Sequence, residues 1–97
     1  MGRVVGIDLG TTNSVVAVVE MSGCKILHNC ENEQQTRSVV GFHNGQFLIG
    51  TPALRRWSLA PKETVISIKR LMGRAYSDPE ISRVRGKYLY EILAPTE

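Results

Sequence analysis

Two apolar runs open the chain, and their pattern predicts a β-hairpin. Residues 3–9 and 14–19 are rich in valine and isoleucine, the β-branched residues that favour strands. Only residues 10–13 separate them, a length that suits a hairpin turn rather than a crossover helix. Because both faces of each run are apolar, we expect the two strands to lie inside a sheet that is covered on both sides.

Three further short strands are predicted downstream of the hairpin, over residues 25–28, 38–42 and 47–49. The last two flank Asn44 and Gly45, and this dipeptide is a strong signal for a tight turn. The segment 29–37 is polar and shows no hydrophobic periodicity, so it is predicted to be a loop.

The second half of the chain carries three helix-start signals. Thr51 and Pro52 predict an N-cap and first turn of a helix that runs to about residue 59. Thr64 predicts the cap of a second helix, whose apolar face would consist of Val65, Ile68, Leu71 and Met72, with Gly73 as its end.

A third helix is predicted to begin at Asp78 and Pro79 and to end near Gly86. Residues 87–93 then alternate between two sides, a pattern typical of a strand. A final strand with an apolar face and no partner is a liability for an independent domain. We therefore expect the chain to be a truncated product or a piece of a longer gene.

Composition and charge narrow the function classes. The 97 residues make at most one small domain, and 42% hydrophobic with 22% charged residues is ordinary globular composition. The net charge is +3, but the basic residues are spread along the chain and do not interleave with the few aromatic residues. A nucleic-acid interface would concentrate them on one face, so we expect no nucleic-acid partner.

The two cysteines do not indicate a metal site. Cys24 and Cys30 flank His28, a spacing that matches no standard zinc pattern, and we expect two small, partly buried free thiols in a reducing compartment. The N-terminus lacks the pattern of a signal peptide, and no apolar run is long enough to span a bilayer. The expected location is the cytoplasm, with no membrane partner.

The hairpin turn carries the residues with the most chemistry. Gly10 permits a close backbone approach, and Thr11, Thr12 and Asn13 add short donors that reach phosphate oxygens without adding charge. Asp8 lies beside them, and a carboxylate there is compatible with polyphosphate when Mg²⁺ lies between the two. The same residues also suit a plain hairpin with a polar tip, and the composition of the turn leaves both interpretations open.

Three motifs carry a family resemblance. Residues 5–14, V-G-I-D-L-G-T-T-N-S, resemble the opening signature of the seventy-kilodalton heat-shock chaperones, the DnaK family. Residues 68–74, I-K-R-L-M-G-R, resemble a second family stretch, and residues 48–53 resemble the family's link from strand to helix. The similarity runs in register from residue 1 to about 74 and is weaker over residues 75–97.

The resemblance implies an α/β chain with the actin-like, ribonuclease H-like ATPase fold. The chain would be a partial first lobe: an N-terminal β-hairpin and strands, followed by short helices. Residues 1–37 would begin the core sheet subdomain, and residues 38–97 would form an incomplete peripheral subdomain. The peptide-binding domain would be absent.

The resemblance also implies roles for particular residues. Gly10, Thr11, Thr12 and Asn13 would bind the phosphates of ATP or ADP, and Asp8 would hold Mg²⁺ through water. Lys69, which from the residues alone is an ordinary surface lysine at the edge of an apolar face, matches the family's catalytic lysine beside the γ-phosphate.

The family has proline where this chain has Arg37, a departure that costs rigidity in the loop but does not touch the phosphate-binding turn. In the complete protein, ATP hydrolysis would control the binding and release of unfolded peptides, with a J-domain co-chaperone and a nucleotide exchange factor as partners. The family's adenosine pocket and several catalytic residues lie beyond this sequence, so we expect the isolated 97 residues neither to hydrolyse ATP nor to bind it tightly.

Two alternatives remain at this point. The chain could belong to another actin-like ATPase, such as a filament protein or a sugar kinase, which shares the phosphate hairpin but not usually the stretch at residues 68–74. It could also be a non-catalytic interaction fragment that docks onto other proteins.

Overall fold

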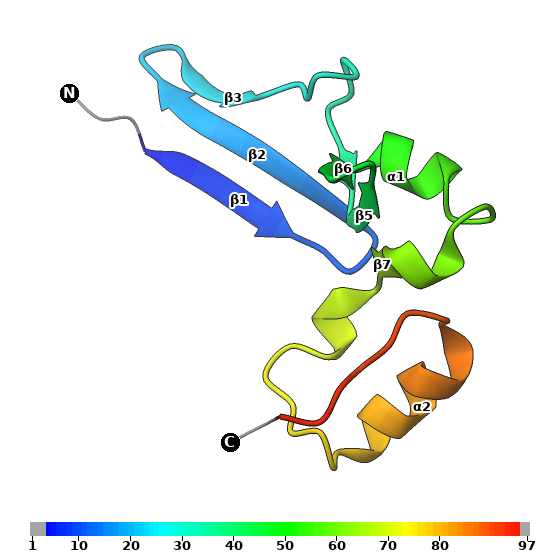
Figure 1. Cartoon of the computed structure of the whole chain (residues 1–97). Helices are drawn as coiled ribbons and strands as arrows, with labels where there is room; N and C mark the ends of the chain where they lie inside the picture. The colour runs from blue at the N-terminus through cyan, green and yellow to red at the C-terminus, as the bar shows by residue number, and fades with distance from the viewer. Residues whose placement is uncertain (1–3, 96–97) are drawn as a thin grey trace.

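The computed structural model describes residues 4–95, which form two antiparallel sheets and two α-helices in an elongated arrangement of 47 × 29 × 23 Å (Figure 1). The first sheet contains β1 (Val5–Leu9), β2 (Asn13–Glu20), β3 (Gly23–Ile26) and β4 (Thr36–Arg37). The second has the order β6-β5-β7 and contains β5 (Val39–His43), β6 (Gln46–Ile49) and β7 (Thr64–Ile66). No helix within the described residues has the length and apolar character needed to cross a bilayer.

The predicted hairpin is confirmed. β1 pairs with β2 in antiparallel register from Val5 opposite Val18 to Leu9 opposite Ser14, so residues 10–13 form the connection. Arg3, the predicted first residue of this strand, lies outside the described residues. β2 is the central strand of the first sheet, because β3 and β4 both pair with its other edge.

The expected burial of the first strand is wrong. Val5, Ile7 and Leu9 of β1 are 50%, 68% and 49% exposed, whereas Val18 of β2 is buried. The helices of the described residues lie beside the second sheet and at the far end of the molecule, so they do not cover β1 (Figure 1). β1 therefore carries more apolar side-chain surface than the described residues bury.

The second sheet matches the predicted hairpin around Asn44 and Gly45. Both residues have positive φ, 51° and 75°, which is the conformation that a two-residue turn of this kind requires. Phe42 and Phe47 are paired across the two strands, and their ring centroids lie 5.4 Å apart in an edge-to-face arrangement. Local turn chemistry thus sets the register of this pair.

The first helix is shorter than predicted and is capped differently. α1 covers Thr51–Arg55, and its N-cap is Gly50 with φ 78°, not Thr51. Ala53 is fully buried, and a Cβ placed on Gly41 of β5 would lie 3.5 Å from the Ala53 methyl, an ordinary van der Waals distance, so α1 packs directly onto the second sheet. Ala53 is thus part of the buried core of the chain.

The predicted second helix is wrong. Residues 64–66 instead form β7, which pairs with β5 from Gly41 opposite Thr64 to Val39 opposite Ile66. Ser67 then takes a left-handed φ of 55°, and residues 68–70 form a single 3₁₀ turn. The β-branched residues at 64–66 favour pairing with a distant strand over a helix whose apolar spacing was only approximate. Gly73 does take the positive φ, 76°, expected of a terminating glycine.

The third helix is confirmed, and the strand after it is not. α2 covers Pro79–Lys87, and the Asp78 carboxylate accepts a hydrogen bond of 2.8 Å from the Glu80 amide, as an N-cap should. Residues 88–93 form no strand, because no partner strand pairs with them within the described residues. The predicted alternation does place the Tyr88 and Tyr90 rings together, stacked at 5.7 Å.

Candidate phosphate-binding site

The connection between β1 and β2 is a tight turn that only glycine permits at its first position. The Gly10 amide donates a hydrogen bond of 3.0 Å to the Asn13 carbonyl oxygen. A Cβ on Gly10 would collide with that same oxygen. Thr11 and Thr12 therefore lie at the tip of a turn with a fixed backbone, and their hydroxyls and amides are the donors available to an anion.

Ser38 holds this turn from the other side. Its amide donates to the Thr12 carbonyl oxygen at 2.8 Å, and its hydroxyl donates to the Gly10 carbonyl oxygen at 2.7 Å. The Ser14 and Ser38 hydroxyl oxygens are 2.9 Å apart, and because Ser38 has already donated its one proton, Ser14 is the donor. Ser38 lies between β4 and β5, so it fixes the turn at the junction of the two sheets.

Lys69 reaches the same hairpin from a distant part of the chain. It lies in the 3₁₀ turn at residues 68–70, and its ammonium donates a hydrogen bond of 2.7 Å to the carbonyl oxygen of Leu9, the last residue of β1. The side chain is exposed, and an ammonium has three donors, so two remain for a ligand. The predicted lysine and the predicted turn are therefore adjacent.

Asp8 lies in β1 opposite Val15 and is exposed. It is two residues before Gly10, at the base of the turn. Mg²⁺ takes one or two carboxylates together with phosphate oxygens and waters, and one exposed carboxylate beside a turn of neutral donors fits that chemistry. Within residues 4–95, no group of three or more histidine, cysteine or acidic side chains could hold a metal on its own, and Cys24 and Cys30 are free and exposed rather than partly buried.

A small hollow borders the tip of the turn. It is lined by Thr11 and Thr12 together with Arg37, Ser38 and Ser67 among others, and its volume is about 130 Å³. Pockets for whole organic ligands usually have roughly 300–1,000 Å³. This hollow thus offers space for a phosphate-sized group and not for a complete nucleotide.

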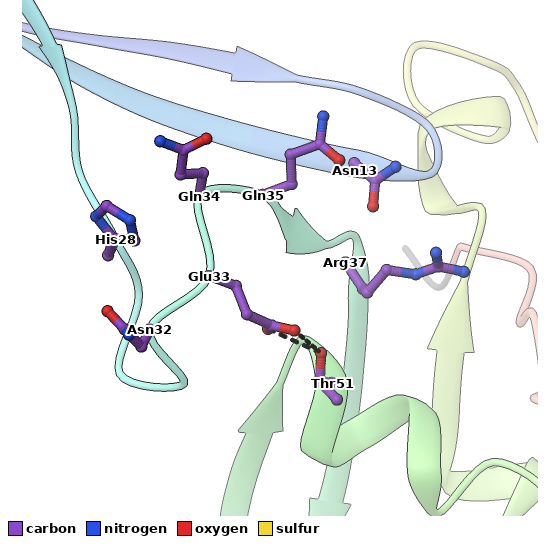
Figure 2. Close-up of a pocket in the computed structure, with 8 residues that line it drawn as sticks. All are labelled: Asn13, His28, Asn32, Glu33, Gln34, Gln35, Arg37 and Thr51. Carbon is purple, nitrogen blue, oxygen red and sulfur yellow. Dashed lines mark hydrogen bonds between the residues drawn. The ribbon is translucent and has the colours of Figure 1, made fainter.

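The polar loop at residues 29–35 is ordered by its own side chains. The Asn29 side-chain oxygen accepts hydrogen bonds from the Glu31 and Glu33 amides at 2.8 and 3.0 Å, and its nitrogen donates to the Thr36 hydroxyl at 3.0 Å. The Thr51 hydroxyl donates to the Glu33 carboxylate at 2.9 Å, which ties the loop to the start of α1 (Figure 2). This bond replaces the N-cap role that the sequence predicted for Thr51.

Arg37 and Ser38 are residues of the site that sequence reasoning missed. Arg37 forms β4 with Thr36 and pairs with Asn13, and Figure 2 shows both side chains at the edge of a polar hollow of about 450 Å³. The departure at Arg37 was visible in the sequence, but its place beside the turn depends on a pairing between segments that are far apart in the chain. No local signal identifies that pairing.

The comparison with known families agrees with this geometry. The model of the HSP70 family, described as Hsp70 protein, matches residues 4–97 of the chain, which is nearly its whole length. The antiparallel sheets with few short helices are those of part of the first lobe of the actin-like fold. The chain therefore belongs to the Hsp70 family of nucleotide-binding chaperones.

Proposed function

We propose that this chain supplies the phosphate-binding hairpin and a catalytic lysine to an ATP-dependent chaperone of the DnaK type. In this proposal Gly10, Thr11, Thr12 and Asn13 bind the β- and γ-phosphates of ATP. The observation that carries it is the hydrogen bond from the Lys69 ammonium to the Leu9 carbonyl oxygen, because it brings a cation to the end of the hairpin from a part of the chain 60 residues away.

Each residue has one task in the proposed reaction. The neutral donors of the turn orient the polyphosphate without altering its charge. Lys69 lies beside the transferred phosphoryl group and the attacking water, and it stabilises the negative charge on the phosphoryl oxygens. Asp8 holds water molecules of the Mg²⁺ shell, and Mg²⁺ when bound supplies charge neutralisation between the carboxylate and the phosphates.

The remaining parts of the proposal concern the complete protein. Hydrolysis of ATP to ADP drives the binding and release of unfolded peptides, with a J-domain co-chaperone and a nucleotide exchange factor as partners, and the protein acts in the cytoplasm. Residues 1–37 belong to the core sheet subdomain and residues 38–97 to the peripheral subdomain of the first lobe. The family match supports the binding of nucleotide and peptide, and the co-chaperones and the subdomain bounds rest on the resemblance of the motifs alone.

The test is ATP hydrolysis by the complete gene product that carries this chain. Lys69→Ala should lower kcat by about a hundredfold or more while ATP still binds, because the lysine acts on charge that develops in the transition state. Lys62→Ala is the matched control, because Lys62, like Lys69, is an exposed lysine at the second position of a 3₁₀ turn. Unchanged hydrolysis in Lys69→Ala would refute the catalytic role.

The isolated residues 1–97 provide a second test. The hollow at the turn accommodates a phosphate-sized group only, so we expect the isolated chain to bind ATP weakly and not to hydrolyse it. Titration calorimetry and a phosphate-release assay measure the two properties. Turnover by the isolated chain that Lys69→Ala abolishes would contradict this expectation.

A further inference from the structure

Arg37 is paired with Asn13, a residue of the proposed phosphate-binding turn. β4 pairs with β2 in antiparallel register, and this register sets Arg37 opposite Asn13. Directly opposed residues of an antiparallel pair project from the same face, with their Cβ atoms roughly 4.5–5.5 Å apart. The face from which Asn13 would contact phosphate is therefore also the face from which the Arg37 side chain projects (Figure 2).

Arg37 also lines two hollows beside the turn. It lines the small hollow that Thr11 and Thr12 border, and it also lines the larger polar hollow that contains Asn13. Its backbone is held on both sides, by the pairing with Asn13 and by the hydrogen bonds of the next residue, Ser38, to the turn. The arginine is thus anchored at the turn and its side chain is exposed.

The charge of Arg37 is not neutralised by a carboxylate of the described residues. The ion pairs within residues 4–95 join Arg74 to Asp78 and Arg83 to Glu80. Glu33 lines the same polar hollow but forms no ion pair with Arg37, and its carboxylate accepts a hydrogen bond from the Thr51 hydroxyl. A guanidinium that is anchored beside neutral donors and has no acidic partner there is suited to an anion.

We propose that Arg37 is a second cationic residue of the nucleotide site, which binds the polyphosphate of ATP beside Asn13. The inference rests on the proposed function, because it assigns a further ligand-contacting residue to the same turn. Lys69 is bonded at the β1 end of the turn, at Leu9, and Arg37 is paired at the β2 end, at Asn13. The two cations then hold the polyphosphate from both ends of the turn.

The experiment compares nucleotide affinities of the complete gene product by titration calorimetry. Arg37→Gln should weaken ATP binding by about ten- to a hundredfold, the range expected for loss of a charge-assisted contact, and should leave adenosine binding unchanged. Arg37→Lys should lose part of the ATP affinity, because lysine keeps the charge but not the bidentate geometry. Arg55→Gln is the control, since it removes an equal charge from the exposed end of α1 and should not alter ATP affinity.

The outcomes separate the two proposals. If the unaltered protein does not bind ATP, both the proposed function and this inference are refuted. If it binds ATP and Arg37→Gln binds it equally well, only the inference is refuted, and Arg37 is a solvated surface arginine. Equal losses for ATP and adenosine would assign Arg37 a structural role and would also refute it. Should the Gln variant fail to fold, the ratio of ATP to adenosine affinity in Arg37→Lys decides the question.

Discussion

The Lys69 ammonium and the Leu9 carbonyl oxygen, 60 residues apart in sequence, are joined by a hydrogen bond of 2.7 Å. Because the lysine is exposed, this bond contributes little to stability. Lys69→Met should therefore lower the free energy of unfolding by only about 0.5–1.5 kcal/mol. Urea unfolding of the chain, followed by the fluorescence of its single tryptophan, Trp57, measures this difference.

A loss of several kcal/mol in Lys69→Met would show that the lysine is a structural residue, and a loss of hydrolysis could not then be assigned to chemistry. Lys62→Met is the control for removing an exposed lysine. If the effect on stability is as small as expected, a loss of hydrolysis in the Lys69 variants can be assigned to the reaction and not to unfolding.

Gly10→Ala should damage the turn itself. The added methyl group would collide with the Asn13 carbonyl oxygen, so the backbone of the turn must shift. We expect a loss of about 1–3 kcal/mol in unfolding free energy, the usual cost of forcing a group into occupied space, together with weaker ATP binding. Gly6→Ala is the matched control, because a Cβ at Gly6 of β1 meets nothing within 4 Å. Equal stability of the two variants would contradict the described turn.

Ser38→Ala should loosen the turn without a collision. The variant keeps the amide bond to Thr12 but loses the hydroxyl bonds to the Gly10 carbonyl oxygen and to Ser14. Because these bonds are partly buried, we expect a loss of about 1–3 kcal/mol, measured by urea unfolding. Ser58→Ala, at an exposed position after α1, is the control. A Ser38→Ala variant as stable as the control would show that the hydroxyl does not hold the turn.

Features set by neighbouring residues were predictable from the sequence. The β-branched runs on either side of Gly10, the turn at Asn44 and Gly45, and the cap at Asp78 each depend on a few adjacent residues, and all three were correct. The glycine and the short donors of the turn were also visible in the sequence, and their role in phosphate binding stays a prediction.

Features set by contacts between distant segments were not predictable. The pairing of β7 with β5 overrode an approximate helical pattern at residues 64–72, and the alternating residues 87–93 did not form a strand without a partner. Ser38 contacts Gly10 across 28 residues, and Arg37 reaches Asn13 through a two-residue strand. The position of Lys69 followed from the family resemblance and not from the predicted helix, which does not exist.

The cap of α2 should make stability depend on acidic pH. The hydrogen bond from the Glu80 amide, and to a lesser extent the nearby Arg74, holds the pKa of the Asp78 carboxyl below its ordinary value of 3.8. A lowered pKa in the folded state contributes stability above pH 3.8, and this contribution is lost as the pH falls through the folded pKa. Asp78→Ala should unfold at a lower temperature at neutral pH.

Asp78→Asn separates the charge from the cap, because asparagine caps helices about as well as aspartate. This variant should stay close to the unaltered chain in unfolding temperature but should lose the part of the acid dependence that Asp78 causes. Thermal unfolding at several pH values on both sides of 3.8 gives the comparison. An identical acid dependence in the Asn variant would exclude Asp78 as its source.

Tyr90 should make the stability of the folded chain depend on pH in the alkaline range. It is 8% exposed, and its hydroxyl donates a hydrogen bond of 2.8 Å to the Ile66 carbonyl oxygen of β7. Burial, together with the adjacent Tyr88, raises the pKa of the Tyr90 hydroxyl above its ordinary value of 10.0. A raised pKa means that the stabilising contribution is complete below pH 10.0 and is lost as the pH rises through the folded pKa.

Tyr90→Phe keeps the ring and removes the ionisable group and the bond to Ile66. We expect it to lower the unfolding free energy at neutral pH by about 0.5–1.5 kcal/mol, the usual contribution of one such bond. Above pH 10.0 the difference between the two chains should shrink, and the tyrosinate absorbance that appears above that pH should lose one component in the variant. A stability difference that stays constant across this range would mean that Tyr90 ionises as readily in the folded chain as in the unfolded one. The hydrogen bond to β7 would then not hold the C-terminal segment against the second sheet.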